Sequence, residues 1–177
     1  MTAVSDVCAR VAQAAIFEPL SEGGPCFYEV ATRGSFYSEG EEVDPVVLIA
    51  RAAKGDIAAQ REISDMALHL ALSGAENVDP FVTLSEGLMT ARMAASQGQA
   101  PDEMRVVVML SLASFWTTGE SAADLTGEAL ARLELLADGD NAYSEPAAQL
   151  LAAYADREPA EYLERAKLYR ARLVETE

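Results

Sequence analysis

The sequence predicts an all-α protein, specifically a short right-handed α-solenoid of antiparallel helix pairs that forms a single domain over residues 1–177. Three observations favour this fold. Apolar residues recur at steps of three and four from residue 57 onward, which is the spacing of one helical face. The dipeptide Ala-Arg recurs at positions 9, 50, 91, 131 and 171, a period of 40 or 41 residues. Glycines at positions 55, 98 and 139 follow three of these dipeptides within eight residues.

Local signals indicate where each helix begins and ends. Asp79 and Pro80 are expected to be an N-cap and a first-turn proline, and Pro101 opens the next helix in the same way. Further helices are expected to begin at residues 57, 121, 144 and 158, with short ones at 45–54 and near 4–16. The three periodic glycines suit helix ends, where the left-handed C′ conformation is common. The repeats are therefore expected at about 45–98, 99–139 and 140–177.

The central helix is expected to be buried on every side. Residues 106–119 carry no charge, and the run is too short to cross a bilayer. A buried strand is the competing interpretation because residues 106–108 are all valine, but the length of the run favours a helix. Met104, Met109 and Trp116 are expected to fill the core. In the helix over 57–73, the inner face is expected to hold Ile63, Met66, Ala67, Leu70 and Ala71, with His69 and Asp65 as a solvated pair beside it.

Three motifs within residues 52–98 point to a known repeat. They are Gly55-x-x-x-Ala59-x-x-x-Ile63, Gly74-Ala-Glu-Asn-Val78-Asp79 and Met93-Ala94-Ala95-x-x-Gly98. This stretch resembles one Sel1-like repeat, a relative of the tetratricopeptide repeat. The resemblance implies a scaffold or adaptor whose concave face holds a partner, with no catalysis of its own.

Residues 17–43 interrupt the helical pattern as an irregular, aromatic and acidic insertion. Prolines and glycines punctuate this segment, and a small β-hairpin with Gly34 in its turn is one interpretation. The segment is expected either to cap the first helices or to form a protein-binding edge, since aromatic residues and arginine are enriched at interfaces. The candidate partner-binding residues in it are Phe27, Tyr28, Arg33, Phe36 and Tyr37.

The charge of the chain, −16, predicts what kind of partner it takes. Nucleic acid is not expected as a ligand, because phosphates need a surface of lysine and arginine. Residues 106–156 hold eight acids and one base, so we expect Glu120 and Asp124 to face a basic or amphipathic protein segment. An acidic surface that only keeps the protein soluble is the simpler interpretation.

No catalytic, metal or cofactor site is expected. The chain has one histidine, and neither Cys8 nor Cys26 has a histidine at metal-ligand spacing. Without a leader or membrane segment, a cytoplasmic location is expected. The expected function is a non-catalytic adaptor or regulator, with an acidic inhibitor as the alternative: a DNA mimic, anti-defence or immunity protein that blocks a nucleic-acid-binding enzyme. The inhibitor needs carboxylates in rows on one outer face, whereas the adaptor needs a concave groove.

Overall fold

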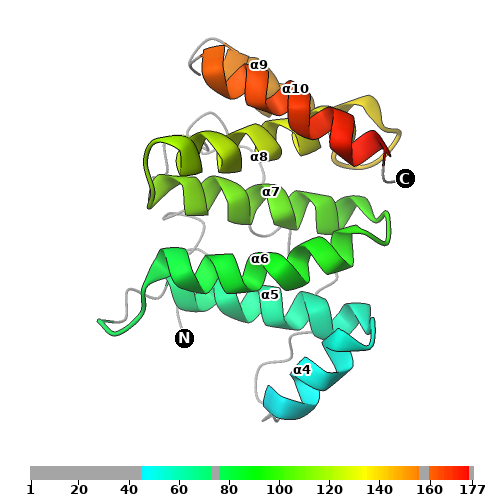
Figure 1. The fold of residues 1–177 in the computed structure, drawn as a ribbon. Coiled ribbons are helices and arrows are strands. Elements are labelled where there is room, and N and C mark those ends of the chain that lie inside the picture. The colour runs from blue at the N-terminus through cyan, green and yellow to red at the C-terminus, as the bar shows by residue number, and fades with distance from the viewer. Residues whose placement is uncertain (1–44, 73–75, 156–159, 176–177) are drawn as a thin grey trace.

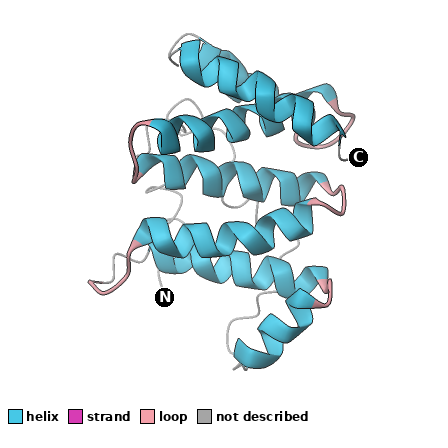
Figure 2. Ribbon diagram, in the orientation of Figure 1, coloured by secondary structure: helices cyan, strands magenta, loops and turns pink. Residues whose placement is uncertain are grey.

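The computed structural model describes residues 45–72, 76–155 and 160–175. This part of the chain forms seven α-helices and no strands (Figure 2), which confirms the all-α expectation for these ranges. The insertion at 17–43, the hairpin expected around Gly34 and the helix expected near 4–16 lie outside the described residues.

The helix bounds agree with the expected starts to within two residues, because caps and prolines are local signals. The helices are α4 (Pro45–Ala53), α5 (Ile57–Leu72), α6 (Pro80–Ala95), α7 (Ala100–Phe115), α8 (Glu120–Asp138), α9 (Ser144–Ala155) and α10 (Ala160–Glu175).

The helices form a stack in which successive helices run in opposite directions (Figure 1). Each helix from α4 to α8 packs against the next one in the chain, and α10 packs against α8. The α5–α6 and α7–α8 connections consequently lie at one end of the stack, on the left in Figure 1, which we call the loop end. The α4–α5, α6–α7 and α8–α9 connections lie at the opposite end.

Three glycines in the described chain have the left-handed backbone. Gly55 and Gly98 have φ values of 88° and 76° after α4 and α6, as expected, and Gly119 has φ of 66° directly before α8. Gly139 directly follows the end of α8, as expected, but its φ of −79° is not left-handed. A Cβ at this position would lie 2.6 Å from the side-chain nitrogen of Asn141, so that side chain would have to move.

The core is centred on α7, as the uncharged run predicts. Every residue from Val106 to Ala113 is at most 2% exposed. The predicted inner face of α5 is partly wrong, because Met66 and Leu70 are 42% and 47% exposed. The side of α5 that is buried includes the polar residues Gln60, Ser64 and Asp65.

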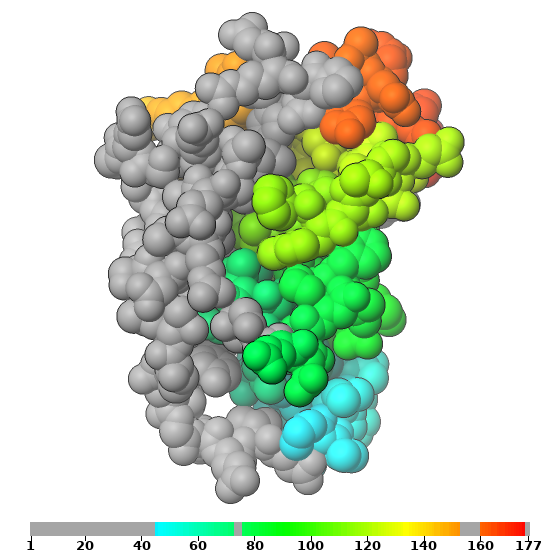
Figure 3. Space-filling view, turned by 90° about the vertical axis from the view of Figure 1, so that its left-hand side faces the viewer, coloured from blue at the N-terminus to red at the C-terminus, as the bar shows by residue number. Residues whose placement is uncertain are grey.

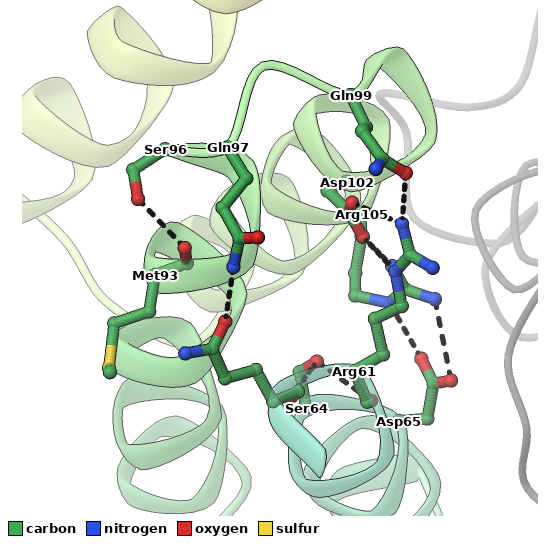
Figure 4. A network of polar contacts seen from close by, with 10 residues as sticks. Arg61, Ser64, Asp65, Met93, Ser96, Gln97, Gln99, Asp102 and Arg105 are labelled. Carbon is green, nitrogen blue, oxygen red and sulfur yellow. Dashed lines mark hydrogen bonds and ion pairs between the residues drawn. The ribbon is translucent and has the colours of Figure 1, made fainter. Parts of the chain in front are cut away.

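A buried ion-pair network explains why polar residues of α5 turn inward (Figure 4). Arg105 of α7 is 1% exposed, and it donates from Nε to Asp65 at 2.8 Å and from Nη1 to Asp102 at 2.7 Å. Arg61 of α5 donates to both oxygens of Asp102 and to Gln99. The expectation that Asp65 and His69 form a solvated pair is wrong in one respect, because Asp65 is buried and bound by Arg105. Burial lowers the pKa of His69, against the opposing charge of Asp65.

Candidate partner-binding site

The acid excess of residues 106–156 is partly balanced by three arginines from other helices. Four carboxylates of α8 are bound in this way, so the region carries less free negative charge than its composition indicates. The pairs are Asp124 with Arg165, Glu128 with Arg92, and both Glu134 and Asp138 with Arg170.

Glu128 shows how strongly one of these carboxylates is held. Its Oε1 accepts hydrogen bonds of 3.0 Å from Arg92 of α6 and from Arg132 of its own helix. Burial alone would raise the pKa of Glu128, but the hydrogen bonds and charges of the two arginines outweigh it and hold the pKa below its usual range. This carboxylate links α6 to α8, which makes it structural rather than open to a partner.

Of the seven residues predicted to bind a partner, two lie in the described chain. Glu120 is exposed in the first turn of α8. Asp124, one turn further on, is half-buried and accepts a 2.8 Å hydrogen bond from Arg165 of α10. Glu120 is thus available to a ligand, whereas the charge of Asp124 is matched within the chain. Phe27, Tyr28, Arg33, Phe36 and Tyr37 lie outside the described residues.

An open pocket of about 710 Å³ lies at the loop end, which Figure 3 views directly. Residues 76–81, from the α5–α6 connection and the start of α6, line it together with Trp116 from the end of α7. We call this the Trp116 pocket. Its lining combines apolar and aromatic side chains with the carboxylates of Glu76 and Asp79. Three of the seven lining residues are polar or charged, and the other four are apolar or aromatic.

Two aromatic residues at the end of α7 are exposed beside this pocket. Trp116 is 37% exposed and Phe115 is 63% exposed. Their ring centroids lie 5.7 Å apart with the planes at 89°, the edge-to-face arrangement that aromatic pairs prefer. The prediction that Trp116 fills the core is wrong, because α7 ends at Phe115 and the chain turns there. The uncharged run continues past the end of α7 to Gly119, so the sequence gives no sign of where the helix ends. The exposure of the indole can be predicted only when that end is known.

Asp79 fixes the pocket wall through its local role as the N-cap of α6. Its Oδ1 accepts hydrogen bonds from the backbone N–H groups of Phe81 and Val82 at 2.9 and 3.1 Å. The side-chain hydroxyl of Thr83 donates to the backbone carbonyl of Asp79 at 2.9 Å. These bonds hold the first turn of α6 against the α5–α6 connection, and Phe81 in this turn lines the pocket.

The loop end is electronegative. Glu76, Asp79 and Glu120 form no ion pair with a basic residue of the described chain. Residues 62–91 and 106–131, which meet here, contain no lysine or arginine. The helix dipoles largely cancel, because α5 and α7 end where α6 and α8 begin. Among the described residues, the carboxylates therefore determine the sign of the potential at the loop end.

Other kinds of site are not seen in the described residues. No group of three or more histidine, cysteine, aspartate or glutamate side chains in these ranges is arranged to hold a metal ion. None of the described helices has the length and apolar character needed to cross a membrane. Comparison of the chain with models of known families, with curated proteins and with solved structures found no match.

Proposed function

We propose that this protein is a non-catalytic interaction module, an adaptor or regulator, that binds a basic or amphipathic segment of a partner protein at the Trp116 pocket. The helix stack is, in this proposal, a short α-solenoid of the Sel1-like or tetratricopeptide kind, and it serves to hold the loop end rigid. The observation that carries the proposal is an exposed indole beside a pocket whose charged side chains, among the described residues, are all acidic.

Two physical arguments support the choice of partner. Exposed tryptophan is costly to leave in water and is over-represented among the residues that dominate binding energy. Carboxylates around such a residue attract a basic segment and repel an acidic one, so they select the partner and speed its approach. Three of the four α8 carboxylates described above form ion pairs with arginines of α10. The carboxylates of Glu76, Asp79 and Glu120 at the loop end have no such partner among the described residues and can attract a ligand.

The experiment is a binding titration with matched charge reversals. A fluorescent arginine–serine repeat peptide is titrated with wild-type protein, with Glu76→Lys/Glu120→Lys and with Asp140→Lys/Glu145→Lys. Both pairs change the net charge equally, and each removes one acid from the first turn of a helix. The control pair lies at the opposite end of the stack, where α8 ends and α9 begins.

We expect the loop-end reversal to weaken binding about tenfold at physiological salt, since two rim charges change sign. The control pair should change it by no more than about twofold, because its charges are more than a Debye length from the pocket at physiological salt. Equal losses in both double variants would mean that net charge alone attracts the peptide. Absence of binding to the wild-type protein at low salt would remove the proposal.

A further inference from the structure

We infer that the Trp116 pocket is a cation site: the indole face of Trp116 seats the guanidinium of a partner arginine, while Glu76 and Glu120 supply the surrounding negative charge. This inference rests on the proposed function and names the anchor residue of the partner. It adds a specific chemistry, because an acidic rim alone would accept any positive charge without requiring an aromatic ring.

The position of Trp116 meets the requirements for such a contact. A cation is attracted to the negative face of an aromatic ring, and tryptophan has the strongest attraction of the aromatic residues. The indole lines an open pocket, so a ligand can reach it. Phe115 packs against it edge to face, which restricts its orientation before a ligand arrives. Arginine suits the site better than lysine, because its planar guanidinium can stack on the ring and still donate to carboxylates.

A second ring in the chain illustrates the contact and provides a control. The guanidinium of Arg172 lies 5.6 Å from the centroid of the Tyr169 ring on α10. Tyr169 therefore already holds a cation from its own helix. Within the described ranges, no corresponding arginine or lysine lies over Trp116. Of these two rings, that of Trp116 is therefore the one open to an external cation.

The test uses the fact that Trp116 is the only tryptophan of the chain. Its emission is recorded while an arginine–serine repeat peptide is added, and affinities are measured by calorimetry. A citrulline–serine peptide keeps the shape of the side chains but removes their charge. The variants are Trp116→Phe, Trp116→Leu and, as the matched aromatic-to-leucine control, Tyr169→Leu. Circular dichroism establishes that each variant is folded before its affinity is compared.

We expect the arginine peptide to change the emission of Trp116 and the citrulline peptide to leave it unchanged. Affinity should decrease in the order wild type, Trp116→Phe, Trp116→Leu, with the last at least about threefold weaker than wild type. Tyr169→Leu should match wild type. Equal affinities of the phenylalanine and leucine variants would overturn the cation contact.

The test separates this inference from the function on which it depends. If the arginine peptide binds wild type and Trp116→Leu equally, and the emission of the wild-type protein does not change, the cation site is wrong. The proposed interaction module would then bind the peptide through its carboxylates alone. If no peptide binds the wild-type protein at low salt, both fail. If the citrulline peptide binds as tightly as the arginine peptide, the pocket recognises shape rather than charge, and again both fail.

Discussion

Replacing Arg105 with methionine tests whether the buried ion pairs hold α5 to α7. Methionine keeps much of the side-chain volume and removes the charge. Asp102 would keep Arg61 as its partner, but Asp65, which is 1% exposed, would lose the arginine that binds it. Removing one partner of a buried pair costs about 3–5 kcal/mol, because the other charge stays in a medium that solvates it poorly. That is a large part of the about 5–15 kcal/mol that stabilises a typical domain.

The assay is urea unfolding at neutral pH, followed by far-ultraviolet circular dichroism. Arg51→Met is the matched control, because Arg51 pairs with Asp56 at an exposed helix connection, with side chains 48% and 33% exposed. Water solvates both charges of such a pair, so this variant should lose less than about 1 kcal/mol. The free energy of unfolding should therefore fall several times further for Arg105→Met than for Arg51→Met.

A double substitution decides whether the loss comes from the unpaired carboxylate. Asp65→Leu/Arg105→Met removes both members of the pair, and an apolar replacement of a buried ion pair is often neutral. We expect the double variant to be more stable than Arg105→Met alone. If it loses the sum of the two single losses, the side chains do not act as a pair. If Arg105→Met loses no more than Arg51→Met, the network does not stabilise the stack and the magnitude given above is refuted.

Two further predictions concern α8. Because Arg92 and Arg132 hold the pKa of Glu128 below its ordinary value of 4.5, its stabilising contribution is complete above that pH and is lost as the pH falls through the lowered pKa. The difference in unfolding free energy between wild type and Glu128→Gln should thus be greatest at neutral pH and shrink in acid; a constant difference would contradict this. In Gly127→Ala the new Cβ would lie 2.6 Å from Cβ of Arg165, so α10 must move away, at a cost of about 1–3 kcal/mol. Amide exchange should accelerate in α10 more than in α5, and uniform acceleration would show that the contact is not local.

The sequence predicts the helix bounds well and the buried faces less well, for a physical reason. A cap such as Asp79 acts on the next few residues, so it can be recognised without knowing the fold. The buried face of α6 is equally clear, because its residues Leu84, Leu88 and Ala91 are all apolar. The inner side of α5 cannot be found in this way. It depends on Arg105, which is 40 residues away in the sequence and resembles a surface residue until its partners are known.

The same reasoning explains what the sequence indicated about the site and what it missed. Counting charges by segment placed the acidic face on Glu120 and Asp124 together, but pairs between residues 41 apart, such as Asp124 with Arg165, cancel charge across segments. Only the folded structure shows which carboxylates lack an ion-pair partner. Trp116 was missed for a related reason, since an uncharged run gives no sign of where its helix stops. Once the stop is known, the indole and Glu120 fall four residues apart on either side of one turn, and this spacing is the reason that both belong to the proposed binding surface.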